Sequence, residues 1–222
     1  MRPVPLWTIL ACFALALHAG GAAGQTIRVA LITTTSGPFA TLGDQIDKSI
    51  RLYQKENAGR LPPGVKVELI VRDDGGPNPD RAKQLVQELI VRDKPDFLTG
   101  FIWTPNAMAV APLLTESKTP LVIMNAAASV ITERSPYIVR VSLTLWQPSY
   151  HIGVWAAKKY KRAYTMVTDF SPGHDAEAAF IKGFTAGGGQ IIGSVRMPIK
   201  NPDFVAYMQK AKDIRPDVIF NM

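Results

Sequence analysis

Residues 25–46 read QTIRVALITTTSGPFATLGDQI. The apolar run Ile27–Thr33 predicts a strand, and residues 41–58 predict a helix that follows it. The two are joined through the turn Ser36–Pro38, which contains a glycine. In α/β proteins, a strand that enters a helix through such a loop is where small ligands bind. This stretch therefore predicts an α/β fold with a binding edge at the end of its first strand.

The same alternation of strand and helix continues along the chain. Further strands are predicted at residues 65–71, 97–101, 121–124, 137–145, 164–168, 191–197 and 218–220. Further helices are predicted from Pro79 to Ile90, from Thr104 onward, and at 149–160, 175–186 and 202–212. Repeated βα units imply parallel sheets that are flanked by helices.

The alternation is interrupted once, at the run Tyr137–Leu145, which we interpret as a segment that crosses between two lobes. The predicted domains are then an N-terminal lobe at 25–142 and a partial second lobe at 143–222. Residues 217–222 form an apolar strand with no helix after it. Because a parallel strand buried on both faces needs covering elements, we expect the second lobe to be incomplete and the chain to be truncated.

Three predicted helices share a start signal, a polar cap residue followed by proline. It occurs at Asn78-Pro79, Thr104-Pro105 and Asn201-Pro202. Proline suits the first helical turn because its φ is fixed and its missing N–H has no partner there. The glycines at 187–189 predict the stop of the helix that precedes them.

The first 24 residues have the three parts of a secretory signal. Arg2 supplies the positive charge, Leu6–Leu17 the apolar region and Ala22–Gly24 a small-residue cleavage site. The apolar run is shorter than the roughly 20 residues that a membrane anchor needs. A lipoprotein site at Cys12 would leave too little apolar sequence before it. We therefore expect export to the periplasm, and cleavage would remove the only cysteine, so no disulfide is predicted.

Composition and motifs argue against nucleic-acid binding and against catalysis. The formal charge is +7, but basic residues are scattered among acidic ones without a basic arm. No G-x-G-x-x-G, G-x-S-x-G, H-E-x-x-H or P-loop motif occurs, and His151 and His174 lack partners that would activate them. The turn Asp73–Gly76 lacks the carboxylate spacing of a calcium loop and is interpreted as a solvated turn. We predict no catalytic residue, metal or cofactor.

Three loops are predicted at the carboxyl ends of neighbouring strands, at residues 34–38, 100–106 and 125–129. In the second loop, the Thr104 hydroxyl could cap the next helix and hold a carboxylate together with that helix's free N–H groups. Trp103 could pack on the apolar part of a ligand; the alternative is a cap beside a buried tryptophan. In the third loop, small residues let backbone amides approach a ligand, although a plain turn uses the same residues.

Several short segments follow one another in an order that resembles a known family. They are Ser36-Gly37-Pro38, Gly43-Asp44-Gln45, Asp73-Asp74, Gly100–Thr104, Asn125–Ser129, and Ser135-Pro136-Tyr137 leading into Arg140. With this order and spacing after a signal peptide, the chain resembles the periplasmic leucine/isoleucine/valine-type binding proteins of ABC importers. The resemblance covers essentially the whole mature chain. It implies the type I periplasmic binding fold, in which two hinged lobes close on a small carboxylate.

The resemblance also implies which residues hold the ligand. In the family, a hydroxyl at the Thr104 position and the loop at Ala126–Ala128 hold the ligand carboxylate. Leu42 stands where amino-acid binders often have tyrosine, and Ala128 where they have threonine, for which Ser129 would compensate. Phe170 occupies the loop of the second lobe that normally contributes an aromatic. The predicted ligand-binding residues are Ser36, Leu42, Trp103, Thr104, Asn125, Ala126, Ala128, Ser129 and Phe170.

The leading hypothesis is a solute receptor of an ABC importer that captures a small carboxylate, either a branched-chain amino acid or an aromatic acid. The apolar character of Leu42, Trp103 and Phe170 favours an aromatic acid. The partners would be the permease and ATPase subunits of the importer, and we expect a monomer. The alternatives are a ligand-sensing domain of a signalling receptor with the same clamp, and a periplasmic enzyme whose catalytic residues lie after Met222.

Overall fold

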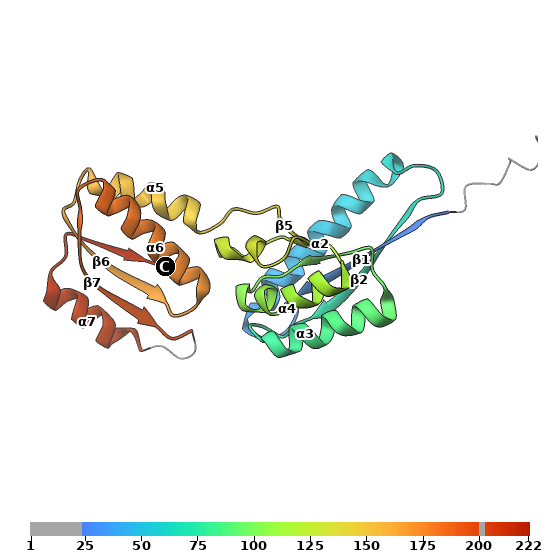
Figure 1. The fold of residues 1–222 in the computed structure, drawn as a ribbon, viewed down its shortest axis with the longest axis horizontal. Coiled ribbons are helices and arrows are strands. Elements are labelled where there is room, and N and C mark those ends of the chain that lie inside the picture. Colours follow the sequence, from blue (N-terminus) through green and yellow to red (C-terminus); the bar gives the residue numbers. More distant parts are fainter. Residues whose placement is uncertain (1–23, 200–202) are drawn as a thin grey trace, which may run out of the picture.

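The structure is a computed structural model that describes residues 24–199 and 203–222. Figure 1 shows two α/β lobes side by side, joined by the segment that follows strand β5. Each lobe is built on a parallel sheet, which confirms the predicted two-lobed α/β fold. The predicted signal peptide up to residue 23 and the predicted cap at Asn201-Pro202 lie outside the described residues.

The first lobe holds a parallel sheet whose five strands run in the order β2-β1-β3-β4-β5 in the described residues. The strands are β1 (Thr26–Thr33), β2 (Lys66–Asp73), β3 (Phe97–Gly100), β4 (Leu121–Ile123) and β5 (Ile138–Arg140). The helices are α2 (Ala40–Asn57), α3 (Pro79–Glu88) and α4 (Thr104–Ser117), with short helical turns at η1 (Gly37–Phe39), η2 (Ala58–Arg60), η3 (Leu89–Asp93) and η4 (Ser129–Glu133). β1 lies between β2 and β3, and its last residues, Val29–Thr33, are all buried.

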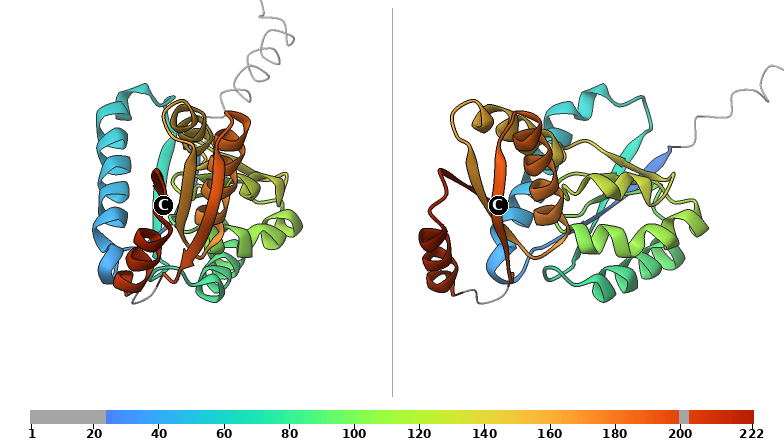
Figure 2. Two further views of the ribbon diagram at one scale, coloured as in Figure 1. Left: turned by 90° about the vertical axis from the view of Figure 1, so that its left-hand side faces the viewer. Right: turned by 60° about the vertical axis from the view of Figure 1, so that its left-hand side comes forward.

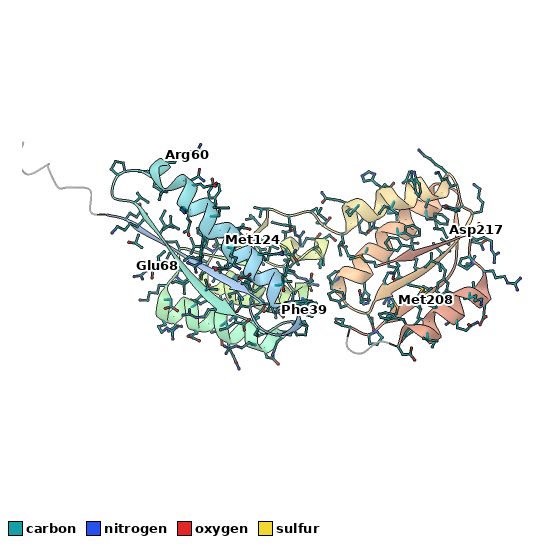
Figure 3. The ribbon with its side chains drawn as sticks, turned by 180° about the vertical axis from the view of Figure 1, so that it is seen from behind. Phe39, Arg60, Glu68, Met124, Met208 and Asp217 are labelled. Carbon is teal, nitrogen blue, oxygen red and sulfur yellow. The ribbon has the colours of Figure 1, made fainter. Side chains whose placement is uncertain are left out.

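Helices cover the two faces of this sheet unequally. α3 and α4 close one face, where Leu85 and Leu114 pack with Leu98 in a single apolar core. On the other face, Gly43 is the only buried residue that α2 contributes. Figure 3 shows α2 across this face, and a groove of about 990 Å³ lies there, lined by Tyr53 and Val67 among others. The packed side therefore carries most of the lobe's apolar burial.

The second lobe has a parallel sheet in the order β7-β6-β8. Its strands are β6 (Arg162–Thr168), β7 (Gln190–Met197) and β8 (Val218–Asn221), and its helices are α5 (Trp146–Ala157), α6 (Ser171–Ala186) and α7 (Phe204–Ile214). Figure 2 shows α7 on the opposite side of the sheet from α5 and α6. Phe180 and Phe184 fill the α5–α6 side, and Tyr164 fills the α7 side, so each face has its own core cluster.

The predicted strands and helices are all present in the described residues, but several boundaries differ. The predicted strand 137–145 is only β5, because its pairing with β4 ends at Arg140. α5 and α6 begin earlier than predicted, since Pro148 and Pro172 fit inside a first helical turn instead of preceding it. α7 is capped by Asp203, whose carboxylate accepts the Val205 N–H at 3.0 Å.

Two glycines let backbone segments meet at the ends of the central strands. A Cβ at Gly43 would overlap the carbonyl oxygen of Thr34, so α2 packs directly on the backbone that leaves β1. Gly100 has φ +103° and a Cβ there would overlap the carbonyl oxygen of Ile32, which joins the ends of β3 and β1. Both positions require glycine for close approach, and Gly100 also requires it for its backbone conformation.

We expect Gly43→Ala to destabilise the protein by about 2 kcal/mol or more, because α2 must move off the β1 backbone to admit the methyl group. Gly59→Ala is the matched control, since a Cβ there meets open space. It should be neutral or stabilise by about 0.5 kcal/mol through a less flexible unfolded chain. Urea unfolding measures both free energies. Equal stability of the two variants would contradict the close approach at Gly43.

Candidate functional site

The carboxyl ends of the strands of the first lobe point toward the second lobe (Figure 1). Phe39, labelled in Figure 3, lies at this end of the lobe, and Arg60 lies at the opposite end of α2. The three loops predicted from the sequence all leave the sheet here, as do the residues that follow β2. This edge is therefore the candidate site.

A buried carboxylate, Asp74, ties together three of the loops at this edge. Its side chain is 1% exposed and accepts hydrogen bonds from the Thr34 hydroxyl at 2.6 Å and the Asn106 amide at 2.9 Å. It also accepts the Gly76 N–H at 3.1 Å. The prediction of a solvated turn at Asp73–Gly76 is thus wrong for Asp74 and Gly76, because α4 brings an amide donor over the turn. A carboxylate directly after a parallel strand was the signal that could have marked Asp74.

Trp103 is fixed at the same edge by its ring nitrogen. The indole N–H donates to the Thr34 hydroxyl oxygen at 2.8 Å, and the residue is 8% exposed. The Phe39 ring meets the indole edge to face, with centroids 4.7 Å apart and an interplanar angle of 80°. Phe39 itself is 44% exposed. The prediction singled out Trp103 but missed Phe39, although an aromatic immediately after the turn Ser36–Pro38 could have been noted.

Asp73 orders the loop that follows β1. Its carboxylate accepts the Thr35 N–H at 2.7 Å and the Gly75 N–H at 3.0 Å. Burial alone raises the pKa of Asp73, but hydrogen bonds from the Ser36 hydroxyl, Thr35 and Gly75 outweigh it and hold the pKa below its ordinary value. The folded state therefore favours the ionised carboxylate. Ser36 is exposed and reaches the site edge through this contact.

Thr104 does not cap α4, contrary to the prediction. It is the first helical residue, the N-cap position belongs to Trp103, and no side-chain cap bond forms there. Its hydroxyl oxygen instead accepts the Ala128 N–H at 3.4 Å, and the residue is 1% exposed. The neighbouring Ala126 N–H donates to the Phe101 carbonyl at 2.8 Å. Two amides that were predicted to reach a ligand are therefore engaged within the lobe.

Arg140, at the end of β5, hydrogen-bonds to the backbone of the loop at residues 125–129. Its guanidinium donates to the carbonyl of Ala126 at 3.2 Å and to that of Ala128. Burial lowers the pKa of Arg140 below its ordinary value, and the negative charge of Asp175 opposes that shift. The guanidinium thus acts as a fixed double donor that sets the shape of this loop.

Two pairs of residues bring side chains of the first and second lobes into contact at this edge. Ser129 donates its backbone N–H to the Asp175 carboxylate at 3.1 Å, and its hydroxyl donates to the other carboxylate oxygen. Asp175 lies near the start of α6, where the Ser171 hydroxyl also meets the Met108 sulfur at 3.9 Å. The start of α6 therefore lies against the candidate edge. Asp175 was not predicted, and a lone carboxylate in a helix gives no sequence signal for such a contact.

The remaining predicted residues lie at the same edge with less contact. Leu42 is 37% exposed on the first turn of α2, and Asn125 is exposed after β4. Phe170 is partly buried at the N-cap position of α6 and so belongs to the second lobe. The structure thus bonds Trp103 to Thr34 and Thr104 to the loop at 125–129, and it leaves Ser36, Leu42 and Asn125 exposed.

The described ranges offer no group of three or more His, Cys, Asp or Glu side chains placed to hold a metal ion. His174 pairs with Asp169 at 2.8 Å on the second lobe. Within residues 24–199 and 203–222, no helix is long and apolar enough to span a lipid bilayer.

Comparisons with known proteins agree with this arrangement. A family model described as periplasmic binding protein matches residues 26–222. The Leu/Ile/Val-binding protein homolog 6 of Brucella abortus (strain 2308) is 40% identical over 221 residues, which are 99% of this chain and 56% of the relative. The chain therefore spans about half the length of the curated relatives it matches.

Two solved structures are also similar. An ABC-transporter solute binding protein from Rhodopseudomonas palustris BisB5, in complex with 3,4-dihydroxybenzoic acid, is 48% identical with a TM-score of 0.82. One from Rhodopseudomonas palustris HaA2, in complex with p-hydroxybenzoic acid, is 46% identical with a TM-score of 0.84. Each match covers 89% of this chain and 54% of the solved chain.

The depressed pKa of Asp73 predicts a pH-dependent contribution to stability. Because the folded-state pKa lies below the ordinary value of 3.8, the contribution is present above that pH and is lost as the pH falls through the folded-state pKa. Asp73→Asn should therefore cost about 1 kcal/mol at pH 7 and progressively less at acid pH. Urea unfolding from pH 7 to pH 3 measures the difference. Asp44→Asn, which breaks only an exposed pair with Lys48, is the control.

A constant difference between wild type and Asp73→Asn over this pH range would contradict the role of the ionised carboxylate.

The contact between the lobes predicts energetic coupling of Ser129 and Asp175. We expect the double variant Ser129→Ala/Asp175→Ala to lose less free energy of unfolding than the sum of the losses in the two single variants. The difference should be about 0.5–3 kcal/mol. The free energy of unfolding is the measured quantity. Ser117→Ala, at the far end of α4, should add to Asp175→Ala without coupling. Additive losses for Ser129 and Asp175 would mean that the contact does not form in solution.

Proposed function

The chain belongs to the periplasmic binding protein family, and from this premise we propose that it captures an aromatic carboxylate outside the cytoplasm for an ABC importer. The secretory signal predicted at residues 1–24 supports export. The partners would be the permease and ATPase subunits of the importer. Binding without chemistry is proposed, in keeping with the family and with the solved relatives, which are transport receptors.

The observation that carries the choice of ligand is the aromatic pair of Phe39 and Trp103 at the ends of the first-lobe strands. The pair meets edge to face, and the exposed Leu42 lies one helical turn away from Phe39. Such a wall favours a flat ring, because aromatic contacts add to the burial of apolar area. Relatives that are 48% and 46% identical hold hydroxybenzoic acids, which supports the same ligand class.

The polar end of the ligand requires donors that reach the surface. Thr104, Ala126 and Ala128 are each buried to at least 99% and bond within the first lobe, so we assign them to shaping the loop. Asn125 is exposed at the same edge, so we assign its amide to the ligand carboxylate. The Ser36 hydroxyl bonds to Asp73, and Ser129 donates both its N–H and its hydroxyl to Asp175, so we assign these two serines to shaping the edge of the site.

Closure would bring the second lobe onto the bound ligand. Phe170 stands at the start of α6, the helix that already touches the first lobe through Asp175. A ligand stabilises the closed form only by the difference in its affinity for the two forms. An aromatic ring held between Trp103 and Phe170 would supply that difference, because each lobe alone offers one side of the contact.

Ligand titration tests the proposal. At a concentration of 100 times the Kd, 4-hydroxybenzoate, 3,4-dihydroxybenzoate or benzoate should stabilise the chain by about 2.7 kcal/mol, which raises the melting temperature by several degrees. Leucine should raise it less. Melting temperatures that respond to leucine and to none of the aromatic acids would contradict the proposal.

Trp103→Leu should weaken the binding of the aromatic acids by about tenfold or more, because it removes one wall of the site. Trp155→Leu is the matched control, since Trp155 is 52% exposed on α5 and packs under Lys159, away from the candidate edge. Calorimetric titration measures both. Equal affinities in the two variants would remove Trp103 from the site.

A further inference from the structure

The proposed function does not explain a chain of two hydrogen bonds, here called the relay, that joins the buried residues Asp74, Thr34 and Trp103. Asp74 accepts the Thr34 hydroxyl at 2.6 Å, and the same hydroxyl oxygen accepts the Trp103 indole N–H at 2.8 Å. Asp74 and Thr34 are each 1% exposed and Trp103 is 8% exposed. The hydrogen bond between this N–H and Thr34 is therefore buried.

The direction of the relay is set by the groups around Asp74. The Gly76 N–H can only donate, so Asp74 Oδ1 accepts it. The Asn106 amide nitrogen lies 2.9 Å from the Gly76 carbonyl, which can only accept, so that nitrogen also donates to Asp74 Oδ2. The carboxylate is thus surrounded by donors, and the single hydrogen of Thr34 points to it. Only lone pairs of Thr34 remain, and they accept the indole N–H.

We propose that Asp74 is a positioning residue for ligand recognition, which acts through Thr34 to lock the indole of Trp103 with its N–H turned away from the ligand. The ring then presents only hydrocarbon to the site, with Phe39 edge to face beside it. Without the relay, the indole could turn its N–H toward the site and offer a polar wall. Asp74 would thereby select for an aromatic ring over a ligand of equal charge that lacks one.

Asn106 connects this group of hydrogen bonds to α4, the helix that begins directly after Trp103. It is fully buried in the first turn of α4, and its amide bridges Asp74 and Gly76. The start of α4 is therefore fastened to the loop after β2 through the same carboxylate that orients the indole. The inference rests on the proposed function, because selectivity has meaning only if the site binds aromatic acids.

The test uses two variants of Thr34, one that changes only its hydroxyl and one that changes only its methyl group. Thr34→Val keeps the shape and removes the hydroxyl, whereas Thr34→Ser keeps the hydroxyl. Thr99→Val is the control, because it removes another buried hydroxyl, which donates from β3 to the Val122 carbonyl in β4 at 3.0 Å. The ligands are benzoate and cyclohexanecarboxylate, which share a carboxylate and differ in the ring. The ratio of their affinities is the readout.

Thr34→Val should lower the benzoate to cyclohexanecarboxylate ratio by about fivefold or more, on the scale of one lost hydrogen bond. Thr34→Ser should restore most of the ratio, and Thr99→Val should leave it unchanged. A purely structural role for the relay would lower stability in Thr34→Val and Thr99→Val alike without moving the ratio. An unchanged ratio in Thr34→Val would therefore overturn the proposal.

A second readout needs no ligand. Exchange of the Trp103 indole proton, followed by NMR, should be slow in the wild type and in Thr34→Ser, and at least about tenfold faster in Thr34→Val. Asp74→Ala should have the same effect as Thr34→Val on this proton. The wild type could fail to bind aromatic acids and still show slow exchange of the indole proton that becomes faster in Thr34→Val. In that case the proposed function is wrong, but the hydrogen bonds that fix the indole are supported. Fast exchange in the wild type would refute the lock itself.

Discussion

A carboxylate buried in a protein must be surrounded by hydrogen-bond donors, and much of this site is arranged around that requirement at Asp74. Its donors come from the ends of β1 and β2 and from the first turn of α4. Those segments can supply them only if the three chain ends converge. Next to this cluster, Thr104 at the start of α4 accepts the Ala128 N–H. Arg140 at the end of β5 donates to the carbonyl of the same Ala128. The edge of the first lobe is thus one connected polar unit above an apolar core.

Under the proposed function, the two lobes would contribute to binding in different ways. The first lobe offers a surface whose hydrogen bonds are already made, so little ordering remains when a ligand arrives. The second lobe touches it through Ser129 and Asp175 and through the side chains at the start of α6. A hinge after β5 can change the distance between the lobes without disturbing the prepared surface. Under the proposed function, recognition would belong mainly to the first lobe and closure to the second.

The order of strands and helices could be predicted from the sequence because apolar periodicity is a local property. The strand predicted at 137–145 fails for a physical reason. Val139, Val141 and Leu143 alternate as in a strand, yet they are 56%, 71% and 58% exposed, because β4 pairs with only three residues of this segment. The start of α4 was placed correctly but its cap was not, since Trp103 and not Thr104 holds the flanking position. The roles of Asp74 and Asp175 depend on partners 32 to 46 residues away in sequence, which no local pattern reveals.

The directions of α4 and α6 add a further property to the edge. Both helices begin there, one in each lobe, and Ser171 meets Met108 between them. A helix start carries roughly half a positive charge from its aligned peptide dipoles. The gap between the lobes is therefore bordered by two such fields, of which Asp175 offsets part. Under the proposed function, these helix starts would favour a negatively charged ligand, and the aromatic side chains would favour a flat ring. Changes to the aromatic wall would alter which acid is accepted while leaving the preference for acids in place.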